Sequence, residues 1–295
     1  MVKFVYVGQG GSLSIIPLKR LCDKGFYPEA VIVADKSQHP RKLNLLPVRP
    51  PRLADSLASV ANELGLPVID WQKGSEAEIE RKLGDILPNL VIMSCFPWRI
   101  PESLLAIPRQ GWWNLHPSLL PAYRGPTPIF WQAKAGEINI GISLHQVLPS
   151  LDSGAIIGQQ TVSVPNFQRD ELEVELAQQG ASLIEHGLLA LAKGELQACP
   201  QQEAKANYQG FPTWHDRRIE ITASASAAYR FIRLVNSAYS LWFELESRPY
   251  KVMDAVSFDD QGILLDEPYQ LEGNRLIIQF EQGTLIALVE EIQWR

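Results

Sequence analysis

The chain has few cysteines and no long apolar run, and each absence excludes a class of protein. Its three cysteines, Cys22, Cys95 and Cys199, lie far apart in a chain of 295 residues and match no metal-site or disulfide spacing. We therefore expect reduced core residues in a cytoplasmic protein, without a bound metal. No segment approaches the roughly 20 apolar residues of a membrane span, and the first residues lack the pattern of a signal peptide. We expect no membrane partner.

An excess of positive charge is also lacking. The chain carries 27 Lys and Arg against 33 Asp and Glu, a formal net charge of −6. This balance argues against a protein held to nucleic acid or membrane by its overall charge, although a local basic patch stays possible. A hydrophobic fraction of 46% and a charged fraction of 20% are typical of a globular protein, and the length suits one large or two modest domains.

The first half of the chain alternates short β-branched runs with amphipathic stretches. The runs are Lys3 to Val7, Ala30 to Ala34, Pro67 to Asp70 and Asn89 to Cys95, and Leu53 to Leu64 has helical spacing. Continuous apolar runs separated by helices predict buried parallel strands. The fold class is therefore α/β, with an open, Rossmann-like, mostly parallel sheet.

A glycine-rich turn follows the first predicted strand. The residues Gly8-Gln9-Gly10-Gly11 suggest a dinucleotide fingerprint, but its third glycine would fall at position 13, which is Leu13. The sequence therefore predicts a tight turn from strand to helix and gives little support to a nicotinamide site.

A second region begins near residue 205. Asp170 to Leu191 has the pattern of a long amphipathic helix, and the polar stretch Ala198 to Gln209 resembles a linker. We therefore expect one domain over residues 1–204 and a smaller one over 205–295. The smaller domain should have a helix near Ala223 to Val235 followed by antiparallel strands in a β-rich, OB-like arrangement. The strand candidates are Leu241 to Leu245, Tyr250 to Phe258, Leu271 to Phe280 and Thr284 to Ile292.

Residues 111–131, GWWNLHPSLLPAYRGPTPIFW, carry the densest set of chemically useful groups. Asn114 and His116 are two positions apart, so an extended segment places both side chains on one face. An Asn amide can donate to a developing oxyanion, and a histidine can move a proton at neutral pH. Asp152, in the later segment GISLHQVLPSLDSG, is the candidate carboxylate that orients the imidazole. Because no G-x-S-x-G motif is present, we expect direct transfer without a covalent enzyme intermediate.

These motifs resemble the 10-formyltetrahydrofolate-dependent formyltransferases, which share Asn-x-His-x-Ser-Leu-Leu-Pro and a downstream Asp-x-Gly. The resemblance covers about the first 200 residues. It implies that Asn114 binds the formyl oxygen, that His116 acts as acid/base and electrostatic stabiliser, and that Asp152 orients His116 and accepts the amine proton. The co-substrate would be 10-formyltetrahydrofolate, and no metal is implied. The resemblance also places folate contacts in the loop leading to Asp152 and at Cys95, Phe96, Pro97, Ser118, Leu119, Leu120 and Pro121.

Two further polar residues have open roles. His145 falls in a predicted strand, where a core histidine and a pocket-wall histidine are equally consistent with the sequence. Arg124 follows the motif, and we expect it to hold the loop by bonding backbone carbonyls rather than to touch substrate.

The acceptor amine has to be inferred from the rest of the chain. In length and in the C-terminal β domain the chain resembles the methionyl-tRNA formyltransferases, so methionyl-tRNA is the best candidate. The basic segment Asp35 to Arg52 could contact tRNA through Arg41, Lys42 and Arg49, or could be a solvated loop. From residue 205 onward nine Lys and Arg face thirteen Asp and Glu, which weakens a tRNA acceptor.

Other activities therefore stay open. They are a sugar-nucleotide or other small-amine N-formyltransferase, a 10-formyltetrahydrofolate hydrolase and a silent folate-binding module. No obligate protein partner is inferred.

Overall fold

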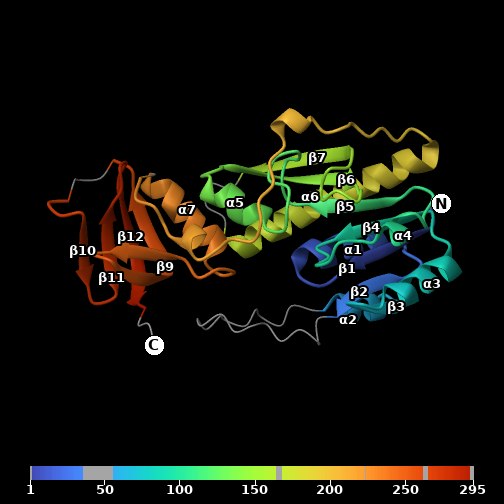
Figure 1. The fold of residues 1–295 in the computed structure, drawn as a ribbon, viewed down its shortest axis with the longest axis horizontal. Coiled ribbons are helices and arrows are strands. Elements are labelled where there is room, and N and C mark those ends of the chain that lie inside the picture. The colour runs from blue at the N-terminus through green and yellow to red at the C-terminus, as the bar shows by residue number, and fades with distance from the viewer. Residues whose placement is uncertain (1, 36–55, 164–167, 223, 262–264, 293–295) are drawn as a thin grey trace.

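The computed structural model describes residues 2–35, 56–163, 168–222, 224–261 and 265–292. Its larger part is built on a seven-stranded sheet with the order β3-β2-β1-β4-β5-β6-β7 (Figure 1). The first five strands are parallel, whereas β6 is antiparallel to β5 and to β7. The strands are β1 (Phe4–Gly8), β2 (Val31–Asp35), β3 (Val68–Gln72), β4 (Leu90–Ser94), β5 (Trp112–His116), β6 (Asn139–Gln146) and β7 (Ile156–Ser163). The predicted mostly parallel α/β sheet is confirmed.

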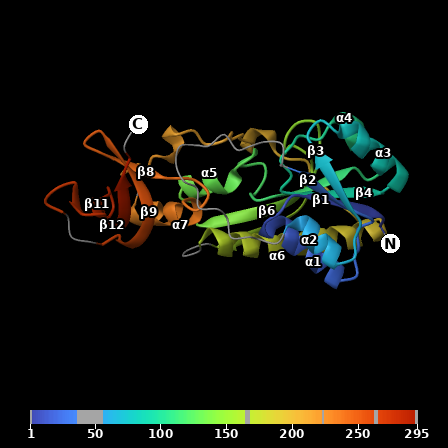
Figure 2. The same cartoon turned by 90° about the horizontal axis from the view of Figure 1, so that it is seen from below.

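Helices cover both faces of this sheet, because the strands bury side chains in both directions. In β1 Phe4 and Tyr6 join the core under α1, α2 and α6, whereas Val5 and Val7 join the core under α3 and α4. Figure 2 shows these two groups of helices on opposite sides of the sheet. The helices of this part are α1 (Ser12–Asp23), α2 (Leu57–Glu63), α3 (Glu76–Ile86), α4 (Glu102–Leu105), α5 (Pro128–Lys134) and α6 (Arg169–Lys193).

The glycine-rich segment after β1 is a tight turn into α1, as predicted. Gly11 precedes the helix with a φ of 83°, a conformation that side chains with a Cβ disfavour. A Cβ on Gly8 would lie 2.9 Å from the hydroxyl of Ser14, so α1 packs closely against the end of the strand.

The C-terminal part is a five-stranded antiparallel sheet with the order β10-β11-β12-β9-β8. This confirms the expected β-rich domain, except that the run Leu271 to Phe280 forms two strands joined by a turn at Gly273 and Asn274. The elements are α7 (Ala225–Val235), β8 (Trp242–Leu245), β9 (Arg248–Asp259), β10 (Tyr269–Glu272), β11 (Arg275–Gln279) and β12 (Thr284–Glu291).

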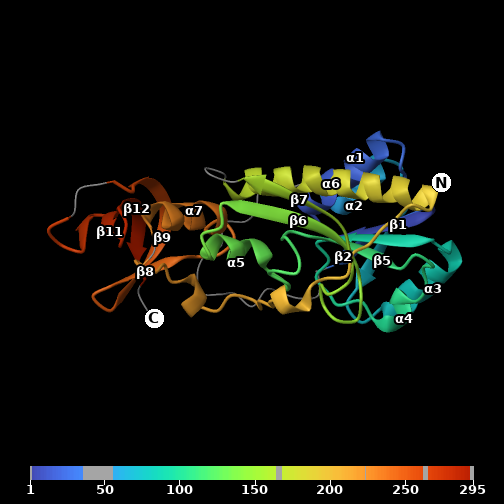
Figure 3. The same cartoon turned by 90° about the horizontal axis from the view of Figure 1, so that it is seen from above.

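A continuous apolar cluster joins the two sheets through α5 and α7. The ring of Phe130 packs edge-on against Phe231 and Tyr239, with centroids 5.5 Å and 5.1 Å apart. Between α6 and α7 the chain forms two short 3₁₀ turns, Glu203–Lys205 and His215–Arg217. Figures 1 and 3 show this connection running from the end of α6 back across the larger sheet toward α5.

One sequence expectation about the core is wrong. Cys22 is buried and Cys95 partly buried, but Cys199 is exposed on the connection after α6. Its backbone pairs with Ile156 at the edge strand β7, where its side chain meets solvent. Within the described ranges, no helix has the length and apolar character of a membrane span.

Close packing of α6 on the sheet depends on Gly180. A Cβ at this position would lie 2.9 Å from the side chains of Ile142 and Leu115. We expect Gly180→Val to lower the free energy of unfolding by about 1–3 kcal/mol, because the added atoms overfill the interface. Gly84→Ala in α3 is the matched control, since its Cβ would meet no atom within 4 Å, and it should raise stability by about 0.5–1 kcal/mol. Urea unfolding measures both, and equal effects would contradict this account.

Candidate active site

Strand β5 carries the first two predicted site residues. Asn114 and His116 alternate along the strand with the apolar residues Trp113 and Leu115, so both point to the same side of the sheet. Both are buried. Strand β6 runs antiparallel to β5, and its register places His145 directly opposite Asn114. A third polar side chain thereby joins the pair that the sequence had identified.

Asp152 enters the site from the loop between β6 and β7. Its backbone has a φ of 53°, in the left-handed region, and the following turn fits only because Gly154 lacks a Cβ that would collide with the Gln146 carbonyl. The carboxylate is buried and lies between two imidazoles. Its Oδ2 is 3.7 Å from Nδ1 of His116, and its Oδ1 is 3.7 Å from Nε2 of His145. The backbone N–H of Gly125 donates to Oδ2 over 2.9 Å.

The protonation of His116 follows from its neighbours. Its Nε2 lies 2.9 Å from the backbone carbonyl oxygen of Tyr123, which can only accept, so Nε2 carries the proton. Nδ1 then faces the Asp152 carboxylate with a lone pair. In this tautomer Nδ1 is the one ring atom of His116 that has a lone pair for a further proton.

His145 holds Asn114 in place as a neutral acceptor. Its Nδ1 lies 2.7 Å from the Gln146 carbonyl and must donate there, so its Nε2 accepts the Nδ2–H of Asn114 over 3.1 Å. Burial lowers the pKa of His145 to about 4, and the adjacent Asp152 carboxylate opposes this shift only in part. The side chain therefore stays uncharged at neutral pH. One N–H of Asn114 is fixed by this bond, and the other is available to a ligand.

Arg124 is a structural residue, but its partners differ from the expected backbone carbonyls. It donates to the side chains of Gln201 and Glu203, with distances of 2.7–3.1 Å. This guanidinium lowers the pKa of the Glu203 carboxyl through hydrogen bonds. The partners come from the connection after α6, which no local sequence pattern places beside the motif.

The predicted folate contacts fall in two groups. Phe96 follows β4 with Cys95 and Pro97, and its ring packs between Trp71 and Trp98 at centroid distances of 4.8 Å and 5.2 Å. The second group, Ser118, Leu119, Leu120 and Pro121, lies after β5. Ser118 and Leu120 are buried, and their backbone groups bond the hydroxyl of Ser143 on β6 over 2.6 Å and 3.1 Å.

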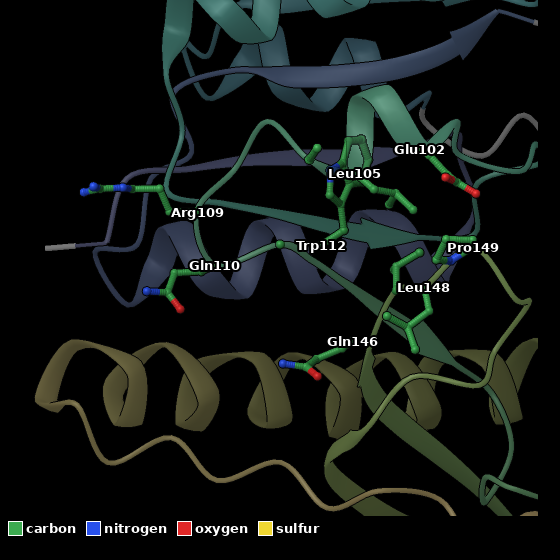
Figure 4. Close-up of a pocket in the computed structure, with 11 residues that line it drawn as sticks. Glu102, Leu105, Arg109, Gln110, Trp112, Gln146, Leu148 and Pro149 are labelled. Atoms are coloured by element: carbon green, nitrogen blue, oxygen red, sulfur yellow. The ribbon is translucent and has the colours of Figure 1, made fainter.

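A cavity of about 540 Å³ opens beside the start of β5. It is lined by Leu105, Trp112 and the first part of the loop that leads to Asp152, Gln146 to Pro149 (Figure 4). Neither Trp112 nor Leu105 belongs to a sequence pattern that predicts a pocket. The only sequence signal for this cavity was the expectation that the loop before Asp152 would contribute to a pocket.

Three predicted acceptor contacts cannot be located relative to the site. The basic side chains Arg41, Lys42 and Arg49 lie outside the described residues. In the described part of the chain no three His, Cys, Asp or Glu side chains are grouped as metal ligands would be.

The depressed pKa of His145 predicts a pH-dependent stability. Its value near 4 in the folded state lies below the ordinary 6.5, so the unfolded state binds more protons between these values. The contribution of His145 to the free energy of unfolding is therefore complete above pH 6.5 and is lost as the pH falls toward 4. We expect the stability difference between the wild type and His145→Gln to shrink over this window in urea titrations. A difference that stays constant from pH 7.5 to pH 4.5 would refute the assignment.

Comparisons with known proteins agree with the geometry. The sequence pattern of the formyl transferase family matches residues 4–189. A methionyl-tRNA formyltransferase of Halalkalibacterium halodurans is 30% identical over 295 residues, covering 98% of this chain and 87% of that protein. One from Parafrankia sp. is 34% identical over 194 residues, which span 65% of this chain and only 62% of that relative's length.

The fold also has solved counterparts. The crystal structure of WlaRD, a sugar 3N-formyl transferase, superposes with a TM-score of 0.71 at 17% identity, covering 100% of this chain and 99% of that one. This likeness concerns the fold. The family pattern, by contrast, spans more than half of the chain and includes the strand and loop that carry Asn114, His116 and Asp152. The chain therefore belongs to the formyl transferase family.

Proposed function

We propose that this protein transfers a formyl group from 10-formyltetrahydrofolate to a primary amine, and that the acceptor is the amino group of methionyl-tRNA. The observation that carries this proposal is the grouping of three buried side chains, Asn114, His116 and Asp152. The Asp152 carboxylate lies 3.7 Å from the imidazole of His116 and 3.7 Å from that of His145. A carboxamide, an imidazole and a carboxylate in one buried place supply an oxyanion donor and a proton path.

Asn114 acts on the formyl oxygen. When the amine attacks, this oxygen gains negative charge, and the N–H of Asn114 that does not bond His145 can donate to it. Because His145 already fixes the amide plane, little reorganisation is needed as the charge develops. The co-substrate contributes the formyl group and a nitrogen that leaves with a proton.

His116 and Asp152 move that proton. The amine loses one proton as the new C–N bond forms, and the leaving nitrogen needs one. The Asp152 carboxylate can accept the first, directly or through water, and pass it to the lone pair of Nδ1 of His116. The resulting imidazolium stabilises the oxyanion and returns this proton to the leaving nitrogen. The N–H of Gly125 and the carbonyl of Tyr123 keep the two groups facing each other.

The folate ring is proposed to bind in the cavity beside β5. Leu105, Trp112 and Leu148 provide apolar walls for a planar ring, and the polar residues Gln110 and Gln146 also line the cavity. Phe96 and its neighbours, which follow β4, would border this site. The segment Ser118 to Pro121, which follows β5 and is bonded to β6, would support it. Pro149, which lines the cavity, lies three residues before Asp152.

The acceptor is assigned from the relatives. Both curated relatives described above are methionyl-tRNA formyltransferases, and one aligns over nearly the whole chain, C-terminal sheet included. The basic segment with Arg41, Lys42 and Arg49 supplies cations of the kind that contact phosphates.

An amino sugar is the second candidate acceptor, and the pairing of the C-terminal arginines favours it. Arg218 pairs with Glu220 and Glu244, Arg248 pairs with Glu291, and Arg217 lies over the ring of Tyr239. Cations engaged within their own domain contribute less to an RNA-binding face. The acceptor assay separates the two candidates.

The catalytic assignment is tested by substitution. We expect His116→Ala and Asp152→Asn each to lower formyl transfer at least about 10²-fold, because each removes a proton-transfer group. Asn114→Ala should lower turnover by roughly 10²–10³ through the loss of one oxyanion donor. Steady-state kinetics and equilibrium binding of the folate measure both effects, and binding should be largely retained. A variant of His116 or Asp152 with wild-type turnover would overturn its assigned role.

The acceptor assignment is tested with methionyl-tRNA. Replacing Arg41, Lys42 and Arg49 together by Ala should raise the KM for tRNA and reduce the slope of log affinity against log salt by up to about 2–3. Replacing Arg81 and Lys82 on α3 by Ala is the control, and the KM should stay unchanged. Transfer to an amino-sugar nucleotide but not to tRNA would establish the second candidate. Release of formate without any acceptor would indicate a hydrolase.

A further inference from the structure

The connection between α6 and α7 is bonded to the two loops that carry the site. We call residues 199–210 the strap. At one end the backbone of Cys199 pairs with Ile156 on β7, and at the other the Gly210 carbonyl accepts from the indole N–H of Trp131 over 2.9 Å. Between these points the strap bonds Arg124 and Asp152, which are far from it in sequence.

One side chain of the strap, Gln201, joins both loops. Its amide N–H groups donate to the backbone carbonyls of Asp152 and Gly154 over 2.8 Å and 2.7 Å. Its amide oxygen accepts from Nε and Nη2 of Arg124 over 3.1 Å and 2.8 Å. The two donors and the acceptor of this carboxamide are all engaged, so its position fixes the distance between the turn of Asp152 and the loop of Arg124.

These two loops hold the reacting groups through their backbones. Tyr123, next to Arg124, accepts the Nε2–H of His116, and Gly125 donates to the Asp152 carboxylate. Tyr123 and Asp152 both have left-handed backbones, with φ of 58° and 53°, which residues other than glycine seldom adopt. The strap bonds each of them, through Asn207 to the Tyr123 N–H and through Gln201 to the Asp152 carbonyl.

We propose that Gln201 is a positioning residue for formyl transfer, setting the separation of His116 and Asp152 from outside the reaction site. Gln201 acts only through backbone groups and Arg124. Glu203 supports it from the same strap by pairing with the guanidinium of Arg124 over 2.7 Å. The expected effect on kcat rests on the proposed function. The expected effect on the positions of His116 and Asp152 rests on the hydrogen bonds alone.

The kinetic test compares two variants of Gln201 with a variant of the next residue, Gln202. Gln201→Ala removes the bridge, and Gln201→Glu keeps an acceptor for Arg124 but turns a carboxylate oxygen toward two carbonyls. Both should lower kcat by about 10- to 100-fold, with the KM for 10-formyltetrahydrofolate within about twofold of wild type. Gln202→Ala is the matched control, because its side chain is exposed, and it should behave as wild type. Thermal unfolding identifies any variant that loses activity by unfolding.

The kcat values of these three variants decide whether Gln201 is a positioning residue. A Gln201→Glu protein that is folded but slow supports positioning, because its link to Arg124 is preserved while the turn of Asp152 is displaced. Wild-type kcat in folded Gln201→Ala and Gln201→Glu would overturn the proposal. An equal loss in Gln202→Ala would also overturn it, because the effect would then belong to the strap in general.

A second readout does not depend on activity. In ¹⁵N-histidine spectra, wild-type His116 should give the shifts of an Nε2–H imidazole, assigned by the signals that His116→Gln lacks. Gln201→Ala should move these shifts toward a mixture of tautomers, and Gln202→Ala should not. Unchanged shifts in Gln201→Ala would overturn the inference even if the wild type transferred no formyl group, whereas an inactive wild type with the expected shifts would overturn only the proposed function.

Discussion

The site depends on one buried carboxylate that has to be satisfied. Asp152 is nearly inaccessible to solvent, and a buried negative charge is costly unless polar groups stabilise it. The N–H of Gly125 donates to its Oδ2, and the rings of His116 and His145 each lie 3.7 Å from one of its oxygens. Each of these neighbours comes from a different element, so holding the carboxylate among them requires β5, β6 and the loop before α5 to take fixed relative positions. To place the carboxylate there, Asp152 adopts an unfavourable left-handed backbone, and the position two residues later has to be glycine.

The reversal of strand direction in the sheet makes this meeting possible. If β6 were parallel to β5, the following loop would emerge at the same edge as the residues after His116. Because β6 is antiparallel, it ends beside the start of β5, and the loop returns along the strand to bring Asp152 back to Asn114 and His116. The same reversal opens the cavity lined by Leu105, Trp112 and Leu148 at the start of β5. The proposed folate site and Asp152 therefore lie at two ends of a single loop.

What could be predicted from the sequence was local in origin. Continuous apolar runs indicated the buried parallel strands, the two-residue spacing of Asn114 and His116 indicated their shared face, and Gly11 marked the turn into α1. Cross-strand register and long-range contacts could not be predicted in this way. The role of His145 depends on lying opposite Asn114, and the partners of Arg124 lie 77 and 79 residues away. The exposure of Cys199 likewise depends on where the strap runs, because a cysteine at an edge strand meets solvent whatever its own preference for burial.

The two histidines lie against one carboxylate, but their surroundings differ. His145 is enclosed by β5, β6 and the returning loop, so burial lowers its pKa and keeps it neutral despite the nearby negative charge. Its neutral Nε2 is then free to orient Asn114. In His116, by contrast, Nδ1 faces the Asp152 carboxylate and the Tyr123 carbonyl accepts from Nε2–H. This difference between two imidazoles near one carboxylate supports the proposed division of roles, in which His145 orients Asn114 and His116 moves the proton.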